Sequence, residues 1–153
     1  MNGLADRVRS YLESHYVMVL ATQGPDGPWA TPVYFAFADW QLVFASDRDT
    51  RHGVNIGQEA GVSAAITEDY HDWTQNQGVQ LQGTCHRLQT GDEFAQRTYF
   101  GRFPFAREFF HPEGRYHATV KETTHFYALS PADIWFVDNR QGFGQRQHLD
   151  LSR

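Results

Sequence analysis

Short runs of apolar residues, or of alternating apolar and polar residues, recur along most of this chain between turn signals, which is typical of β-strands joined by turns. Such runs predict strands at residues 17–22, 29–37, 41–46, 61–67, 79–85, 124–129 and 134–137. Helical spacing is confined to an N-terminal segment, residues 3–15, a brief stretch at 53–59 and a segment at 92–110 that Pro104 interrupts. Six or seven short strands with few helices predict a mainly β fold, an antiparallel barrel that is closed or nearly closed.

Turn signals divide the chain without separating it into domains. Residues 24–28, Gly-Pro-Asp-Gly-Pro, predict a tight turn, and residues 130–133 should separate the last two strands. We expect one domain over residues 1–153, with a helix at 3–15, a barrel at 17–87, a helical insert at 92–110, final strands at 124–138 and a tail at 139–153 that lacks periodicity. A chain of 153 residues that is 41% hydrophobic has enough apolar material for a single core.

Composition limits the partners and the cellular location. The net charge is −5 and no block of like charge occurs, so we expect no nucleic-acid partner. No basic leader with an apolar core and no apolar run of membrane-spanning length is present, which predicts a cytoplasmic protein without a membrane partner. Cys85 is the only cysteine and the eight histidines show no familiar ligand spacing, so we expect neither a disulfide nor a metal site.

Aromatic residues are frequent, at 15% of the chain. A small barrel cannot bury 23 Phe, Tyr and Trp side chains, so some must lie on an outer face. Such a face predicts a homodimer, whose interface we place near residues 29–37.

The most informative stretch follows the predicted strand at 41–46. There the chain enters a polar turn in which Thr50, Arg51 and His52 stand side by side. A hydroxyl, a guanidinium and an imidazole can all donate hydrogen bonds to a phosphate. The alternative is a solvated turn, because Asp47, Arg48, Asp49 and Arg51 alternate in sign.

This strand and turn resemble those of the pyridoxamine 5′-phosphate oxidase superfamily, the FMN-binding split barrels. The similarity is strongest over residues 14–66, and residues 101–107, 138–139 and 142–144 resemble the YhbP-like branch of small bacterial proteins. The resemblance implies a split-barrel fold, FMN as cofactor and a flavin site shared between two subunits.

Carried over residue by residue, the resemblance assigns a set of cofactor-binding positions. It makes Thr50 and Arg51 phosphate ligands, with His52 where the family usually has lysine. The remaining implied flavin contacts are Thr31, Pro32, Val33, Ala45, Ser46, Gln80, Trp135 and Phe143. Ala30 and Phe35 stand where true pyridoxamine phosphate oxidases carry cations, and Arg146-Gln147-His148 has the residue types of their substrate-binding pair in a different setting. These differences from the true oxidases argue against oxidation of vitamin B6 as the function of this protein.

Two ligand-binding functions follow as hypotheses, beside the possibility that the barrel has lost its ligand and serves as an interaction module. The first is a flavin-dependent oxidoreductase acting on an unidentified small molecule, with NAD(P)H as a candidate reductant, in which the flavin performs the chemistry and no catalytic side chain can be named. The alternative is a non-catalytic protein that binds or stores flavin, haem or deazaflavin. Arg102 and Arg107 are candidates for binding an anionic substrate, although such arginines more often pair with neighbours such as Glu108 and Glu113.

Overall fold

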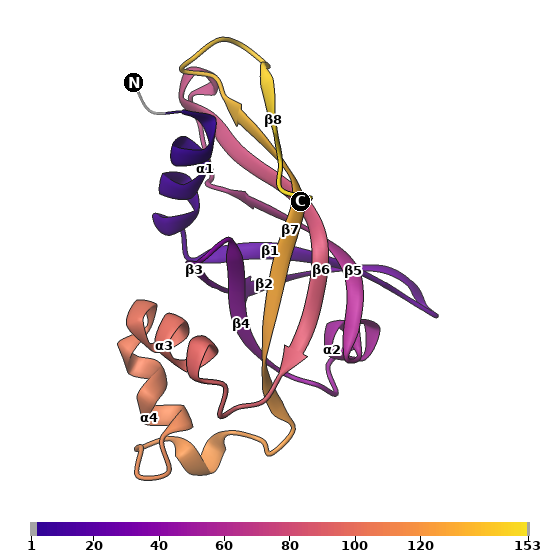
Figure 1. Ribbon diagram of the computed structural model, residues 1–153, viewed down its shortest axis with the longest axis vertical. Coiled ribbons are helices and arrows are strands. Elements are labelled where there is room, and N and C mark those ends of the chain that lie inside the picture. Colours follow the sequence, from indigo (N-terminus) through magenta and orange to yellow (C-terminus); the bar gives the residue numbers. More distant parts are fainter. Residues whose placement is uncertain (1–2, 153) are drawn as a thin grey trace.

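A single curled antiparallel sheet forms the framework of the protein (Figure 1). The computed structural model describes residues 3–152. The strands run in the order β2-β1-β5-β6-β7-β4-β3, and β8 pairs with β7 outside this path. Their bounds are β1 Val17–Gly24, β2 Gly27–Tyr34, β3 Ala36–Ala38, β4 Gln41–Asp47, β5 Glu59–Thr67, β6 Gln77–Leu88, β7 Thr124–Asp138 and β8 Arg146–Asp150. The predicted mainly β, antiparallel class is confirmed.

Short helices flank the sheet. They are α1 Leu4–Glu13, α2 Arg51–Ile56, α3 Glu93–Arg102 and α4 Arg107–Phe110, with 3₁₀ turns η1 Trp73–Gln75, η2 Pro104–Ala106 and η3 His117–Thr119. Figure 1 shows α1 beside one end of the sheet and α3 and α4 beside the other. The brief helix expected at 53–59 begins two residues earlier, because Thr50 caps it: the backbone N–H of Gly53 donates to the Thr50 hydroxyl.

Two hydrophobic clusters make the core. The larger one, which includes Leu12, Met18, Phe44 and Tyr127, joins α1 to the inner face of the sheet. The smaller one, which includes Tyr99, Phe103 and Phe126, packs α3 against β3, β4 and β7. The inner face is buried because strand side chains alternate: in β1, Met18 and Leu20 are buried whereas Val17 and Val19 are exposed.

The prediction of one strand over 29–37 is wrong. The chain bends at Phe35, so that β2 pairs with β1 while β3 pairs with β4. Phe35 is fully buried, and its N–H donates to the carbonyl of Tyr16, 2.9 Å away. The bend takes the chain from β2, at one edge of the sheet, to β3, at the other edge. It also places the Phe35 ring in the core. The alternation of residues along the sequence does not predict either feature.

The C-terminal region also differs from expectation. The two strands predicted at 124–129 and 134–137 are one strand, β7, because Pro131 lies at a bulge where the register with β6 shifts between Gln82 and Gly83. The tail at 139–153 contains β8, which pairs with β7 through residues such as His148 and Leu149. Among the helices of residues 3–152, none is long and apolar enough to cross a membrane.

Candidate functional site

The turn after β4 is built around the Thr50 hydroxyl. Thr50 Oγ1 donates to the carbonyl of Asp47 at 2.8 Å and accepts from the N–H of Gly53 at 3.1 Å. Gly53 fits closely here, since a Cβ would lie 2.7 Å from the carbonyl oxygens of Asp47 and Arg48. The Thr50 side chain therefore shapes the turn, and its proton is already donated within the protein.

His52 lies on the inner side of this turn. Its Nε2 is 2.6 Å from the Ser46 hydroxyl and 3.2 Å from Thr50 Oγ1. The residue is buried, with 8% of its surface exposed. Burial lowers the pKa of His52 below the usual histidine value, because charge is costly away from water. At neutral pH the ring is therefore an uncharged hydrogen-bonding group.

A groove of about 450 Å³ opens above Ser46 and His52. We call it the β2–β4 groove, and its lining residues are Val17, Pro32, Val33, Tyr34, Ala45, Ser46, His52 and Tyr99. The lining is apolar and aromatic along β1, β2 and α3 and polar at the Ser46–His52 end. This volume and this mixture of groups suit a planar ligand with a polar tail.

Five of the residues implied by the resemblance meet in this groove: Pro32, Val33, Ala45, Ser46 and His52. Strand pairing places the first two on β2, and β4 delivers the next two to the start of the turn. Tyr34 and Tyr99 are lining residues that the sequence analysis missed. Tyr34 could have been found by continuing the alternation of β2, but Tyr99 comes from α3 and only tertiary packing brings it here.

Arg51 points elsewhere. Its Nη2 donates to the carbonyl of Asp26, 3.0 Å away, and its guanidinium lies 4.3 Å from the centre of the Trp29 ring. The side chain thus rests on the β1–β2 hairpin, in an exposed position. One hydrogen bond to a carbonyl and one stacking contact at the surface can be exchanged for a contact with an anion.

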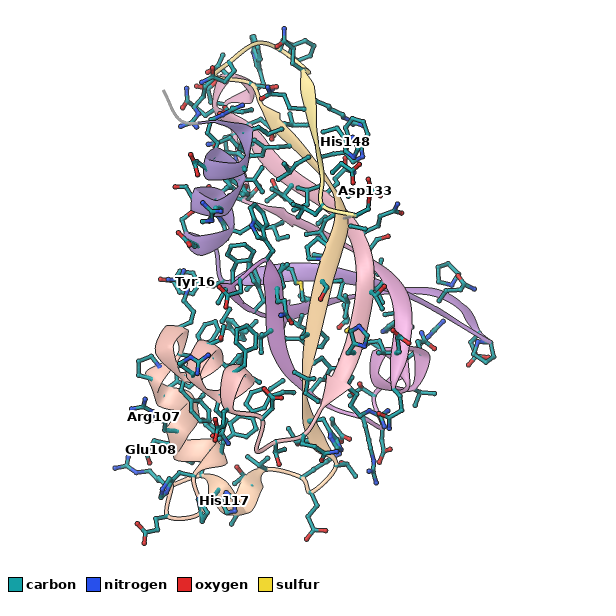
Figure 2. All side chains as sticks on the ribbon, in the orientation of Figure 1. Tyr16, Arg107, Glu108, His117, Asp133 and His148 are labelled. Atoms are coloured by element: carbon teal, nitrogen blue, oxygen red, sulfur yellow. The ribbon has the colours of Figure 1, made fainter. Side chains whose placement is uncertain are left out.

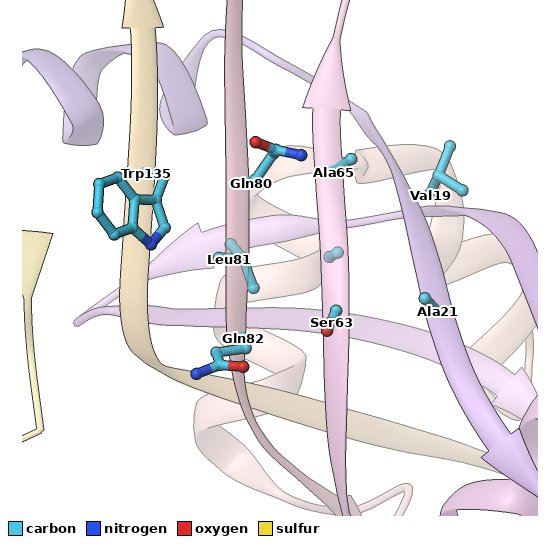
Figure 3. A pocket seen from close by; sticks show the side chains of 9 residues that line it. Val19, Ala21, Ser63, Ala65, Gln80, Leu81, Gln82 and Trp135 are labelled. Carbon is cyan, nitrogen blue, oxygen red and sulfur yellow. The ribbon is translucent and has the colours of Figure 1, made fainter. Parts of the chain in front are cut away.

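Gln80 and Trp135 line a second depression, on the outer face of the sheet (Figure 3). This sheet hollow, also of about 450 Å³, is lined by Val19, Ala21, Ser63, Ala64, Ala65, Gln80, Leu81, Gln82 and Trp135. Strand register puts Val19, Ala65, Gln80 and Trp135 in one row across four neighbouring strands. None of these side chains lines the β2–β4 groove of the same chain.

Beside the hollow lies a pair that the sequence analysis did not recognise. His148 Nε2 is 2.8 Å from Asp133 Oδ1, and the His148 ring stacks on Trp135 with centroids 4.4 Å apart. Gln82 donates to the other carboxylate oxygen of Asp133, and these hydrogen bonds lower the pKa of Asp133. Figure 2 shows Asp133 and His148 close together on β7 and β8. The pairing of β8 with β7 creates this contact, so the isolated tail sequence gave no signal for it.

The remaining candidates lie apart. Thr31 pairs with Leu20 in the sheet, and Phe143 is 77% exposed and contacts Trp73 edge-on. Arg102 donates to the carbonyl of His15 and lies 3.6 Å from the centre of the Tyr16 ring, whereas Arg107 is exposed on α4, next to Glu108 (Figure 2).

Cys85 is fully buried, and burial raises the pKa of its thiol to about 12, so it is unreactive at neutral pH. Within residues 3–152, no three His, Cys, Asp or Glu side chains are grouped to hold a metal ion.

The family is decided by a match over most of the chain: the model of the pyridoxamine 5′-phosphate oxidase family matches residues 4–138. The chain belongs to this family. Within it, the chain is 28% identical over 142 residues to a UPF0306 protein of Klebsiella pneumoniae, covering 90% of this chain and 87% of that protein. It is 25% identical over 143 residues to the UPF0306 protein YhbP of Escherichia coli O157:H7, covering 91% and 88%. The resemblance to the YhbP-like branch is confirmed.

Solved structures agree on the fold. A haem-binding protein from Mycobacterium smegmatis superimposes with a TM-score of 0.77 at 21% identity, over 98% of this chain and 59% of that one. HutZ, the haem storage protein from Vibrio cholerae, gives a TM-score of 0.65 at 13% identity, over 85% and 91%. The chain therefore has the split-barrel fold of this family, and it spans just over half the length of the mycobacterial protein.

Proposed function

We propose that this protein binds FMN and acts as a flavin-dependent oxidoreductase on a small molecule. The main support for the proposal is the β2–β4 groove. Apolar and aromatic side chains line most of it, and the hydrogen-bonded pair Ser46 and His52 lies at one end. A bound flavin supplies hydride chemistry, while the protein contributes orientation, hydrogen bonds and exclusion of water.

The groove fits the two parts of FMN unequally. Pro32, Val33, Tyr34 and Tyr99 offer flat and apolar contacts of the kind that an isoalloxazine ring requires. At the phosphate end, neutral His52 supplies a hydrogen bond without charge. Arg51 is the cation in this turn that completes the phosphate site, once it exchanges the Asp26 carbonyl for the ligand. The proposal thus assigns FMN a moderate affinity that depends on Arg51.

A second copy of the chain would complete the site. Gln80 and Trp135, which the resemblance assigns to the flavin, lie in the sheet hollow and not in the groove. In a two-fold dimer that buries the outer sheet face, the hollow of one copy would face the groove of the other. Val19, Trp29, Tyr34 and Trp135 are each at least 42% exposed on β1, β2 and β7, as an apolar interface requires. We propose the homodimer as the active form.

A non-catalytic binding or storage protein is the second candidate. It is favoured by the haem-binding and haem-storage descriptions of two structural neighbours and by the weak phosphate end of the groove. A neutral imidazole such as His52 is the form that ligates iron. Haem or deazaflavin would then occupy the groove in place of FMN.

Absorption spectra of the purified protein, followed by titration with FMN and with haemin, test the proposal. Binding of FMN with quenched flavin fluorescence, and bleaching by NADH or NADPH without oxygen, would support the oxidoreductase. A flavin that binds but is not reduced would favour storage. A red protein with a Soret band and no affinity for FMN would overturn the proposal.

A further inference from the structure

Three exposed aromatic side chains gather around one buried ring next to the β2–β4 groove. The ring centroids of Tyr16, Tyr34 and Phe105 lie 6.0, 5.6 and 5.8 Å from that of Phe103. Phe103 is 4% exposed, whereas the three outer side chains are each at least 50% exposed. We call Tyr16, Tyr34 and Phe105 the aromatic rim. An exposed apolar cluster of this kind usually marks a binding surface.

The aromatic rim is continuous with the groove. Tyr34 belongs to both, and Phe103 also contacts Tyr99, a lining residue of the groove, with centroids 4.9 Å apart. Tyr16 directly precedes Val17, another lining residue. Figure 2 shows Tyr16 projecting outward between α1 and α3. A ligand that extends from the apolar end of the groove would therefore lie on the rim.

A cation with free hydrogen-bond donors lies at the rim. The Arg102 guanidinium is 3.6 Å from the centre of the Tyr16 ring, and its Nη2 donates to the carbonyl of His15 at 3.4 Å. Arg102 Nε and Nη1 make no hydrogen bond within residues 3–152 and are not among the buried unpaired atoms of that range, so solvent reaches them. The stacking contact holds the guanidinium in place and leaves these donors available.

Neighbouring acidic residues do not engage these donors. Glu108 Oε2 accepts from the backbone N–H of Arg115 at 2.9 Å. Glu13 lines a small depression together with Arg102, but no carboxylate of residues 3–152 forms an ion pair with Arg102. Arg107 is exposed, and no aromatic ring of the same residues contacts its guanidinium. Of the two arginines singled out in the sequence, Arg102 is therefore the one placed at the rim.

We propose that the substrate of the oxidoreductase is a flat conjugated carboxylate, whose body lies on the aromatic rim and whose carboxylate accepts charge-assisted hydrogen bonds from Arg102. This inference rests on the proposed function, because FMN in the groove would place its ring at the apolar end, beside Tyr34 and Tyr99. A partner copy that covers Tyr34 in the proposed dimer would border the same site.

Isothermal titration calorimetry with 2-naphthoate tests this site, with 2-naphthamide as the uncharged analogue. The full-length protein is titrated both free and loaded with FMN. We expect saturable binding of 2-naphthoate in both states, weakened about tenfold or more for 2-naphthamide and for the Arg102→Gln variant. Arg97→Gln is the matched control, because Arg97 lies on the same helix with its guanidinium 5.8 Å from the centre of another ring, that of Phe94.

Two further readouts separate the substrate site from the cofactor site. The dissociation constant of FMN should be the same for Arg102→Gln and the wild type, because Arg102 does not line the groove. Saturation with 2-naphthoate should shift the absorption band of bound FMN in the wild type, since the ligand lies beside the flavin ring.

Phe105→Ala is a second variant, which removes a ring of the rim and leaves Arg102 in place. Phe105 is 57% exposed, so the fold should tolerate the change. Affinity should fall by the same factor for 2-naphthoate and for 2-naphthamide, because the lost contact is apolar. Trp73→Ala, which removes a ring that is 62% exposed away from the rim, should change neither affinity.

The proposal has several outcomes that would overturn it. They are undetectable binding of 2-naphthoate, equal affinities for 2-naphthoate and 2-naphthamide, an Arg102→Gln variant that binds as the wild type does, and competition between FMN and 2-naphthoate for one site. Failure of the proposed function looks different: 2-naphthoate would bind through Arg102 while FMN does not bind at all. That result would overturn the assignment of a flavin substrate and leave Arg102 as a carboxylate-binding residue.

Discussion

At the scale of single residues, the turn after β4 gives different roles to three side chains that sequence reasoning had assigned together to phosphate binding. Thr50 stabilises the turn, His52 faces the groove and Arg51 rests on the hairpin. Three adjacent phosphate-binding residue types thus point in three directions. The difference arises because the helical geometry of α2 turns successive side chains by about 100°.

Replacing Arg51 with alanine should weaken FMN binding roughly 10- to 100-fold, since a charge-assisted contact to phosphate contributes about 1.5 to 3 kcal/mol. Fluorescence quenching of FMN gives the dissociation constants. Arg48→Ala is the control, because Arg48 is exposed in the same turn and lies next to Asp49. An unchanged affinity for FMN in the Arg51 variant would place the phosphate elsewhere.

His52 makes stability depend on pH. Burial lowers its pKa in the folded state, so the unfolded chain binds the proton more readily. Its contribution to stability is complete above the unfolded pKa of about 6.5 and is lost as the pH falls through that value towards the lower folded pKa. Urea unfolding at pH 8 and pH 5.5 should show a smaller loss on acidification for His52→Gln than for the wild type. The exposed His71→Gln variant should behave as the wild type does; identical pH dependence in all three would contradict the prediction.

At the scale of elements, the bulge in β7 decides how the long strands β6 and β7 fit together. Gly83 lies opposite Pro131, where the register shifts. A Cβ on Gly83 would lie 2.1 Å from the carbonyl oxygen of Ser130, so the absence of a side chain permits the close approach of the two backbones. This bulge also directs Asp133 and Trp135 to the outer face, beside the sheet hollow.

Gly83→Ala should therefore lower the free energy of unfolding by about 2 kcal/mol, because backbone atoms must move apart. Gly61→Ala on the adjacent strand β5 is the matched control, since no atom lies within 4 Å of its Cβ position. Urea denaturation measures both variants. If the two substitutions lower the free energy of unfolding by the same amount, the close approach of the backbones at the bulge does not require glycine at position 83.

At the scale of the whole molecule, the outer sheet face is the surface through which the proposed dimer would form. Val19 and Trp135 belong to one cross-strand row on this face and are 44% and 42% exposed. The groove and the hollow lie in separate places on one chain, and pairing of two chains through this face is what would join them.

Val19→Glu and Trp135→Glu should each convert a dimer into a monomer, because a carboxylate would be buried without a partner. Light scattering coupled to size-exclusion chromatography reports the mass, and FMN affinity should fall with the loss of the dimer. Val54→Glu is the control, since Val54 is 62% exposed on α2 outside this face. A wild-type protein that is monomeric at micromolar concentration and still binds FMN would contradict the shared site.

Features that depend on local patterns could be predicted before the structure was known. Short apolar or alternating runs in β1, β4, β5 and β6 predicted the antiparallel β class, and the run from Ala45 to His52 located the end of the groove. These features can be predicted because they depend on residues that are close in the sequence. This holds for the direction of side chains in a strand and for the cap of the following helix.

Other features follow from contacts that form only when the chain folds. The bend at Phe35, the strand β8, the direction of Arg51 and the approach of Tyr99 to the groove each depend on contacts between distant segments. The packing of α1 on the end of β7 is the same kind of feature, because Tyr11 and Phe136 lie 125 positions apart in the sequence and their ring centroids are 5.5 Å apart. Burial and hydrogen bonding across such distances follow from strand order, which hydrophobic periodicity does not encode.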